Sequence, residues 1–352
     1  MPIADRQPRV TIKDVARSAG VHFTTVSLAL RHHPSIPVST RERIEAIAKT
    51  IGYAPNPVFA ALTHFRVHGR VRATPPRVAY LVNHPIEQFQ HEQEFWNGAK
   101  EQAEMLGYEL ELISVSQGHH DSKSLARYLR AQNITGIIIA AFEPGLAELK
   151  LEWSDYAIVK IDSLHMEPET TSVSNDQRHD VRIAFREMQA RGYQRIGLAV
   201  CRASEESIQF RYTAGYLIER AAIPLKDHIP ELLFPRQASP AKISELMGHW
   251  VRKHKIDAVL SNWASLAQLL SDAGLHVPED VACACLCLPV GNTDLAGVQP
   301  NLHMVGVKAV SLLTSQLKQG SRGVSEFASN TYVRSHWQDG PSAPKQNYAT
   351  AP

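Results

Sequence analysis

Hydrophobic residues in the first sixty positions recur at helical spacing, in three short groups. Gly20 ends the first group, and the second spans residues 23–31. Ser39 and Glu42 form a capping box that opens the third group, which Gly52 closes. The predicted inward positions are Ile12, Val15, Ala16, Ala19, Val26, Ala29, Leu30, Ile44, Ile47, Ala48 and Ile51. Two short helices joined at a glycine and braced by a third predict a helix-turn-helix unit, which lays its second helix in the major groove of DNA.

After residue 76 the pattern changes to short apolar runs that alternate with amphipathic stretches. The predicted strands are residues 77–82, 109–115, 136–141, 156–162, 195–200, 257–262 and 281–288, and the predicted helices include residues 98–107, 121–132, 177–191 and 210–221. Such alternation is typical of parallel sheets with helices on both faces. It runs through two cycles, which predicts two α/β lobes and a ligand cleft between them, beyond the carboxyl ends of the strands.

Charge is divided unevenly along the chain. Residues 1–72 carry 11 Lys and Arg against 4 Asp and Glu, whereas the remainder carries 26 against 31. A basic end on a mildly acidic body indicates a polyanion partner for the first segment, although a basic tail without a partner has the same composition. The chain contains no run of roughly 18 apolar residues, so no transmembrane helix is predicted. The N-terminal residues lack an apolar signal core, so we expect a cytoplasmic, nucleoid-associated protein with no membrane partner.

The segments TIKDVARSAGVHFTTVSLALR and VSTRERIEAIAKTIGYAPNPVFAAL resemble the DNA-binding headpiece of the LacI/GalR-type (lactose/galactose repressor) family. The shared motifs include D-V-A-x-x-A-G-V, T-V-S and G-Y-x-P-N. The resemblance implies a homodimeric transcriptional regulator, expected to be a repressor, that reads a near-palindromic operator in double-stranded DNA. The candidate DNA-binding residues are Thr11, His22, Phe23, Thr24, Thr25, Ser27, Leu28, Arg31, Tyr53, Asn56 and Leu62.

The segment after Asn56 resembles the hinge helix of that family, in which a leucine wedges into the minor groove and kinks the duplex. Leu62 stands at the wedge position, and the alternative is a linker leucine without such a role. Phe59 replaces a small alanine usual in the family, and it would crowd the paired helices or act as a second wedge. Leu28 replaces a common arginine. Because leucine packs on a thymine methyl group and cannot bond guanine, we expect a different operator sequence.

The body resembles the two-lobed core of the same family, which is similar to periplasmic sugar-binding proteins. The effector-binding residues that the resemblance implies are Asp162, Arg211, Asn262, Trp263 and Cys287. Trp263 stands where an aspartate is frequent, and Cys287 and Leu288 replace two carboxylates. We therefore expect a small-molecule effector that is possibly sugar-derived but not a simple hexose: a smaller, more apolar ligand or one whose own anion meets Arg211. Structural roles for these side chains, and a site without an effector, remain alternatives.

Cys283, Cys285 and Cys287 alternate along the predicted strand of residues 281–288 and would share one face. That spacing is too long for a disulfide, and the further ligands that zinc needs are absent. Cys283 and Cys285 are expected in the core, with Cys287 at the effector site. A thiol or metal sensor through these cysteines, or an effector-independent DNA binder, is the alternative function. Motifs for phosphate binding, a nucleophile elbow or a zinc protease are missing, so neither enzymatic activity nor a cofactor is expected.

The expected fold class is an all-α helix-turn-helix headpiece with a hinge helix, followed by an α/β two-lobed core with parallel sheets. The expected domains are residues 9–56 for DNA binding, 57–75 for the hinge helix and linker, 76–340 for effector binding and dimerisation, and 341–352 as a disordered tail. Within the core, the first lobe would comprise residues 76–172 and 298–325, and the second lobe residues 173–297 and 326–340.

Overall fold

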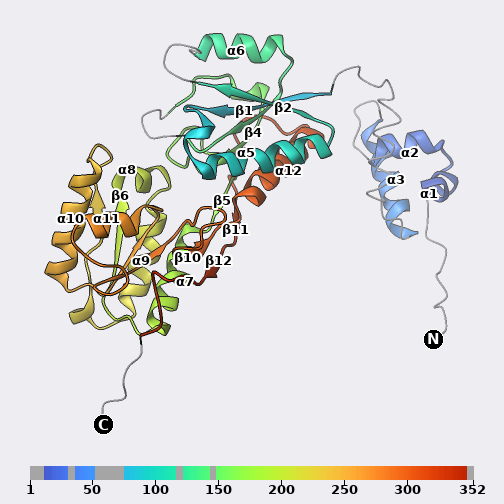
Figure 1. Ribbon diagram of the computed structural model, residues 1–352. Helices are drawn as coiled ribbons and strands as arrows, with labels where there is room; N and C mark the ends of the chain where they lie inside the picture. The colour runs from blue at the N-terminus through green and yellow to red at the C-terminus, as the bar shows by residue number, and fades with distance from the viewer. Residues whose placement is uncertain (1–11, 31–35, 52–74, 116–121, 143–147, 347–352) are drawn as a thin grey trace. The chain divides into compact units, whose positions relative to one another are not determined.

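The computed structural model describes residues 12–30, 36–51, 75–115, 122–142 and 148–346, in two compact units that divide after Thr74 (Figure 1). Helices α1 (Ile12–Ala19), α2 (Phe23–Ala29) and α3 (Val38–Thr50) form the described part of the first unit. They bury Val15, Ala16, Ala19, Val26, Ala29, Ile44 and Ala48 in one core, with Leu30, Ile47 and Ile51 packed against it. The predicted inward faces are thus confirmed, except at Ile12, whose side chain lies outside the described residues.

The turn between α1 and α2 depends on Gly20 and His22. Gly20 has φ +66°, a left-handed conformation that glycine adopts without strain, and it ends α1. The His22 carbonyl oxygen accepts from Thr25 N at 2.9 Å and Val26 N at 3.3 Å, so His22 is the N-cap of α2, as predicted. The predicted capping box is wrong, because α3 begins before Ser39 and has Pro37 as its N-cap, without a side-chain cap.

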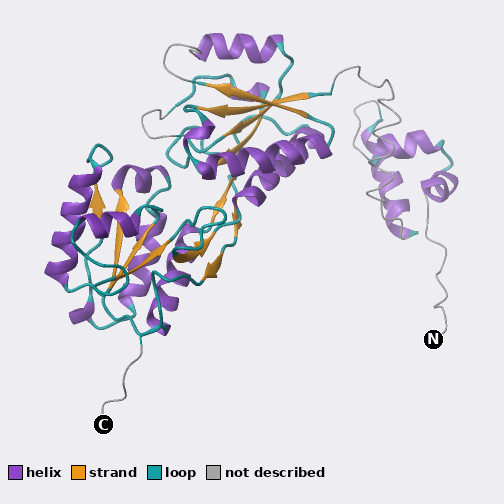
Figure 2. Ribbon diagram, in the orientation of Figure 1, coloured by secondary structure: helices purple, strands orange, loops and turns teal. Residues whose placement is uncertain are grey.

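The second unit contains two six-stranded sheets with helices on both faces (Figure 2). The strand orders are β11-β5-β4-β3-β1-β2 and β12-β10-β9-β8-β6-β7, in which only the β10–β12 pair is antiparallel. Both orders place the second strand outside the first, as in doubly wound folds. The strands are β1 Arg77–Val82, β2 Glu109–Ser114, β3 Gly136–Ile139, β4 Ala157–Ile161, β5 Ser172–Asn175, β6 Ile196–Cys201, β7 Leu232–Phe234, β8 Ala258–Ser261, β9 Ala282–Cys285, β10 Ala296–Gln299, β11 Asn330–Val333 and β12 His336–Gln338.

Helices complete two lobes around these sheets. The first sheet packs α5 and α12 on one face and α6 on the other, and the second sheet packs α7 and α9 on one face and α10 and α11 on the other. The helices are α5 Gln90–Met105, α6 Ser122–Ala131, α7 Gln177–Ala190, α8 Arg202–Ser207, α9 Arg211–Ala221, α10 Pro240–His254, α11 Leu266–Asp272 and α12 Leu302–Gln319, with 3-10 turns at Ile86–Gln88, Trp153–Asp155 and Leu225–Asp227. The structure therefore confirms the predicted fold class.

The chain crosses between the two lobes after β5, after β10 and after β11. The crossings shift the predicted lobe boundaries. Residues 173–175 and 330–333 belong to the first sheet, since β11 pairs in parallel with β5, and residues 298–299 belong to the second. The expectation of a second-lobe segment beginning at residue 326 is wrong for this reason.

The last described residues, 341–346, are ordered against the second lobe. Ser342 Oγ donates to Cys283 O at 2.8 Å and accepts from Ala296 N at 2.9 Å. Tyr193 Oη donates to Pro344 O at 2.8 Å. The expected disordered tail is therefore wrong up to Gln346, because hydrogen bonds to β9 and β10 hold a segment whose composition resembles a linker. Residues 347–352 lie outside the described residues.

Two glycines let α5 and α12 approach at backbone distance. A Cβ atom on Gly98 would lie 1.9 Å from His303 O, and one on Gly306 would lie 2.0 Å from Phe95 O. Both obstacles are backbone atoms, which cannot move aside as a flexible side chain can. This crossing secures α12 to the first lobe after the chain has left the second.

We predict that Gly306→Ala destabilises the protein by about 3 kcal/mol, because the added methyl group overpacks the α5–α12 crossing. Helix propensity alone predicts the opposite, a gain of about 1 kcal/mol. Denaturant unfolding followed by circular dichroism measures the difference. Lys308→Ala, at an exposed position of the same helix, is the control. A transition midpoint at or above that of the wild type would contradict the prediction.

Candidate functional site

Helix α2 carries the described candidates for DNA contact. His22 and Phe23 are exposed, Phe23 to 44%, and their ring centroids lie 4.3 Å apart. Thr25 and Leu28 are half-buried, so Leu28 is less outward than predicted. The side chains of Thr24 and Ser27 lie outside the described residues, as do Thr11, Arg31, Tyr53, Asn56, Phe59 and Leu62. Phe23 therefore stays a predicted DNA contact, at the start of the second helix.

In the second unit, two loops with strained backbones, one from each lobe, contact each other. Asp162 and Ser163, directly after β4, have φ +48° and +47°, and Gln209 and Phe210, before α9, both have φ +56°. A left-handed backbone is unfavourable for such residues and is found where surrounding contacts enforce it, often at functional sites. The loops touch: Leu164 N donates to Ser207 O at 3.0 Å, and Gln209 Nε2 donates to Leu164 O at 3.3 Å.

Asp162 is the partly exposed acidic residue of this region. It is half-buried and accepts a 3.1 Å hydrogen bond from Gln177 Nε2 at the start of α7. Burial raises its pKa to about 6, opposed by the Gln177 hydrogen bond and the Arg211 charge and reinforced by Glu92. The carboxylate is thus crowded by protein, while part of the Asp162 residue still meets solvent.

Arg211 supplies the positive charge opposite Asp162. Its Nη1 donates to Ser174 Oγ at 2.8 Å, and its guanidinium carbon lies 5.0 Å from the Tyr332 ring centroid. Ser174 lies on β5 and Tyr332 on β11, both in the first lobe, whereas Arg211 begins α9 in the second. The predicted effector residue Arg211 therefore also links the lobes, with its planar fork fixed in place.

Two buried carboxylates that the sequence analysis missed lie near Asp162. Asp180 on α7 is 1% exposed, and burial raises its pKa to about 8, with the Asp176 and Asp162 charges adding and Ser335 opposing. Glu92 on α5 is 2% exposed, and its carboxylate lies 3.7 Å from His84 Nε2 and 3.5 Å from His91 Nε2. The available signal was a polar residue within an otherwise apolar helix face, Glu92 before Phe95 and Asp180 before Val181 and Ala184.

The remaining predicted effector residues differ in their surroundings. Cys287 is half-buried, and burial, with smaller contributions from Cys285, Asp180 and Asp162, raises the pKa of its thiol, so the thiol lies within electrostatic range of the two aspartates. Trp263 instead packs within the second lobe, 4.9 Å from Phe234 in an edge-to-face arrangement. Asn262 follows β8, and its Oδ1 atom is buried without a hydrogen-bond partner among the described residues. We call Glu92, Asp162, Asp180, Arg211 and Cys287 the inter-lobe cluster.

The other cysteines are core residues. Cys283 and Cys285 are fully buried on the α10–α11 face of the second sheet, and burial raises their pKa values to about 12 and about 11. Strand β9 ends at Cys285, so the predicted strand of residues 281–288 was too long and Cys287 turns off its face. Among the described residues, His, Cys, Asp and Glu form no group of three that could hold a metal ion. The thiol- and metal-sensing alternative therefore gains no support.

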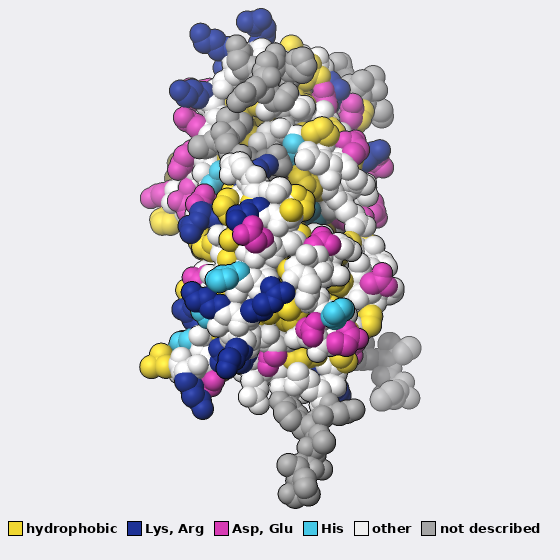
Figure 3. Space-filling view, turned by 60° about the vertical axis from the view of Figure 1, so that its left-hand side comes forward, with side chains coloured by type: hydrophobic (Ala, Val, Ile, Leu, Met, Phe, Trp, Pro, Cys, Tyr) yellow, Lys and Arg dark blue, Asp and Glu magenta, His cyan; other side chains and the backbone are white. Residues whose placement is uncertain are grey.

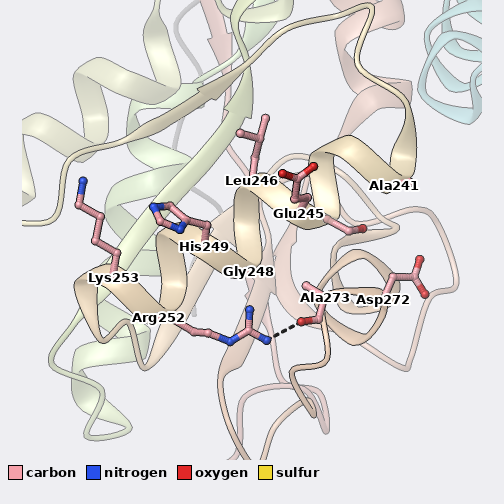
Figure 4. Close-up of a pocket in the computed structure, with 10 residues that line it drawn as sticks. Ala241, Glu245, Leu246, Gly248, His249, Arg252, Lys253, Asp272 and Ala273 are labelled. Carbon is pink, nitrogen blue, oxygen red and sulfur yellow. Dashed lines mark hydrogen bonds between the residues drawn. The ribbon is translucent and has the colours of Figure 1, made fainter.

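A separate cavity of about 1060 Å³ lies between α10 and α11 (Figure 4). Three of its charged groups are engaged: Arg252 donates to Ala273 O at 2.6 Å, Glu245 pairs with Lys242, and Asp272 accepts from Gln268.

The surface and the inter-lobe cluster differ in the balance of charged side chains. On the face shown in Figure 3, basic and acidic side chains are interspersed. In the inter-lobe cluster, acidic side chains outnumber basic ones.

The fold and the cluster define a two-lobed ligand-binding core joined to a helix-turn-helix unit. Residues 11–56 match the family model described as bacterial regulatory proteins, lacI family, and residues 78–283 match periplasmic binding proteins and sugar binding domain of LacI family. The second match alone covers more than half of the 352 residues. The chain therefore belongs to the LacI family of DNA-binding transcriptional regulators and is not an enzyme.

Individual relatives agree with this assignment. The chain is 26% identical over 348 residues to the HTH-type transcriptional regulator PtxS of Pseudomonas putida, covering 95% of this chain and 98% of that protein. It is 23% identical over 363 residues to the HTH-type transcriptional regulator GalR of Escherichia coli, covering 97% and 99%.

Solved structures share the fold. A lac repressor dimer bound to operator and the anti-inducer ONPF aligns with TM-score 0.55 at 18% identity, covering 96% of this chain and 100% of that chain. The complex of the regulator CelR with cellobiose aligns with TM-score 0.55 at 17% identity, covering 95% and 100%. No helix in the described part of the chain is long and apolar enough to cross a membrane.

We predict that Asp180→Asn changes how stability depends on pH. Burial holds the Asp180 proton in the folded protein up to about pH 8, against an ordinary pKa of 3.8. The stability that this proton contributes is full below the ordinary pKa and is lost as pH rises toward 8. Relative to the wild type, the unfolding free energy of the variant should therefore rise by roughly 2 kcal/mol between pH 6 and pH 8.

Thermal and urea unfolding across this pH range, without added ligand, measure the effect. Asp272→Asn, an exposed aspartate of α11, is the matched control and should follow the wild type. Parallel pH profiles for wild type and Asp180→Asn would show that the Asp180 carboxyl titrates normally.

Proposed function

We propose that this chain is a homodimeric, sequence-specific repressor that binds a near-palindromic operator through its headpiece and responds to a small molecule at the inter-lobe cluster. The observation that carries the proposal is the headpiece itself: a described three-helix unit whose second helix presents Phe23 to solvent, in a segment with an excess of basic residues. Positive charge supplies sequence-independent affinity for the phosphates, and the second helix supplies base readout. Operator binding would place the protein on the nucleoid.

The family supports the finer parts of this proposal. One relative of known structure is a dimer bound to operator and an anti-inducer, and another binds cellobiose. Transferred to this chain, these properties predict paired headpieces on two half-sites and an effector held between the lobes. The candidate contacts are those named from the sequence, of which His22, Phe23, Thr25 and Leu28 have described side chains.

Control by the effector would work through the lobes. Three hydrogen bonds connect the lobes. Gln177 of the second lobe donates to Asp162, and Leu164 of the first lobe donates to Ser207. Arg211 of the second lobe donates to Ser174 of the first. A ligand that binds one lobe arrangement more tightly shifts the population toward it. The same coupling free energy then changes operator affinity, provided that the hinge segments of the dimer depend on the lobe arrangement.

We predict that Phe23→Ala weakens specific operator binding about tenfold, equivalent to about 1.4 kcal/mol, because it removes apolar contact at the start of the recognition helix. Genomic footprinting of the wild type first identifies the bound sites. Fluorescence anisotropy on one such site and on a scrambled duplex then separates specific from non-specific affinity. Thr50→Ala, an exposed position at the end of α3, is the control. Absence of any enriched site, or equal affinity for both duplexes, would refute the proposed function.

We predict that Leu62→Ala reduces both specific affinity and operator bending, because the proposed wedge leucine offsets base unstacking with apolar contact. Affinity should fall at least about tenfold, while the circular dichroism spectrum and melting temperature stay unchanged. Bending is measured by energy transfer between dyes at the ends of the operator. A variant that binds as tightly as the wild type to an equally bent duplex would assign Leu62 to the linker without a wedge role.

A further inference from the structure

The inter-lobe cluster contains more buried acidic groups than basic ones. Glu92, Asp162 and Asp180 interact electrostatically with one another through Asp162, and Arg211 is the arginine that faces Asp162. The Arg211 guanidinium is already engaged by Ser174 and by the Tyr332 ring. Burying a carboxylate without a matching cation is unfavourable, so Asp180 keeps its proton up to about pH 8, and a bound cation would allow this carboxyl group to ionise.

Buried acceptors without donors point the same way. Among the described residues, Glu92 Oε2 and Gln177 Oε1 have no hydrogen-bond partner, although their residues are 2% and 4% exposed. The Gln177 amide already donates its Nε2 to Asp162. The fully buried Tyr80 Oη, which interacts electrostatically with Glu92 and Asp162, likewise has no hydrogen-bond partner in the part of the chain that the structure describes. A native protein seldom leaves several buried polar atoms unsatisfied in one place, and a ligand is one explanation.

We propose that the effector of this chain is a small organic cation, a protonated amine, whose ammonium group binds the Asp162 carboxylate near Glu92 and Asp180. The inference rests on the proposed effector role of the inter-lobe cluster. Asp162 would provide direct contact, and the bound cation would favour ionisation of the buried Asp180 and Glu92 carboxyl groups. A metal ion is a poor alternative, because the described residues place no three His, Cys, Asp or Glu side chains suitably for one.

The proposal reverses the expectation taken from the sequence. Cys287 and Leu288 stand where the resemblance implies carboxylates, which suggested an apolar ligand or one with its own anion for Arg211. Leu288 is fully buried in the core of the second lobe. The carboxylates are instead supplied by helices α5 and α7, so the site keeps its acceptors and changes their position.

The groups around the cluster make proton linkage a direct test of ligand charge. His91, Gln177 and Arg211 face Asp162 and favour its ionised form, whereas Glu92 opposes it; Asp176 and Asp162 oppose ionisation of Asp180, and Ser335 favours it. His84 Nε2 and His91 Nε2 both approach Glu92 Oε1, at 3.7 Å and 3.5 Å. A cation favours the ionised carboxylates, so its binding releases protons and tightens as pH rises from 6 to 8. An anion bound to Arg211 favours the protonated carboxylates, so its binding takes up protons and weakens over the same range.

The experiment uses the full-length protein and a matched set of six-carbon probes. Glucamine, sorbitol and gluconate share an open polyol chain and end in an ammonium, a hydroxyl and a carboxylate group. Ethanolamine, putrescine and agmatine extend the amine arm, and potassium chloride equalises ionic strength. Thermal shift ranks the probes, since a ligand that binds only the folded state raises the melting temperature. Calorimetry in two buffers of different ionisation enthalpy then counts the protons exchanged.

We expect at least one amine to raise the melting temperature more than sorbitol and gluconate do, with proton release at pH 7. Asp162→Asn should weaken that amine at least about tenfold, and asparagine tolerates the left-handed backbone at this position. Glu92→Gln should weaken it less, and Asp180→Asn should flatten the pH dependence. Glu104→Gln, an exposed position on the same helix as Glu92, is the control and should bind like the wild type.

The inference is overturned if no amine exceeds sorbitol and gluconate, if binding takes up protons, or if Glu92→Gln and Asp162→Asn both bind the amine as the wild type does. Should Asp162→Asn fail to fold, the wild-type pH profile and Glu92→Gln still decide the matter. Operator binding is measured separately. A protein that binds its operator but no amine refutes this inference alone, whereas one that binds amines but no operator refutes the proposed repressor function.

Discussion

Burial of both faces of each parallel sheet is the constraint on which the rest of this structure depends. Strands such as β3 and β8 are buried along their whole length and are mostly apolar, so they offer few side chains that could bind a ligand. Ligand-binding groups are therefore expected mainly near the strand ends and on the helices that border them. Asp162 after β4 and Cys287 beyond β9 are therefore brought together by the same rule acting in two lobes.

The sequence predicted the parts of this fold that rest on local patterns. The apolar runs of β1, β3 and β4 and the helical faces of the headpiece need no distant partner to be recognised. It did not predict β10 or β11, short strands whose pairing with β9 and β5 is set by distant residues. Nor did it predict the ordered segment around Ser342, since the hydrogen bonds that hold it are made to the backbone of Cys283 and Ala296.

The candidate site was predictable in position and less so in chemistry. The resemblance located Asp162, Arg211 and Cys287 at strand or helix ends. In the structure, the Asp162 carboxyl group interacts electrostatically with the Arg211 guanidinium and with the Cys287 thiol. It placed Trp263 in the same group, but that ring packs on Phe234. Glu92 and Asp180 escaped notice because each is a single polar residue on a mostly buried helix face. Whether such a residue meets solvent, a partner or a second acid depends on packing that sequence spacing does not encode.

Strain and desolvation meet in the same loops, and this combination suits a regulatory switch. Asp162 has an unfavourable backbone conformation and a carboxylate with raised pKa, in a loop that contacts the other lobe. The left-handed backbone and the desolvated carboxyl group of Asp162 each cost free energy. If another arrangement of the lobes relieved these costs, the equilibrium between the two arrangements would be sensitive to small changes at the cluster. Protons and a cationic ligand would stabilise the same carboxylates in alternative ways. They therefore compete, and by reciprocal linkage the pH of the cell would set how much ligand is needed to alter operator binding.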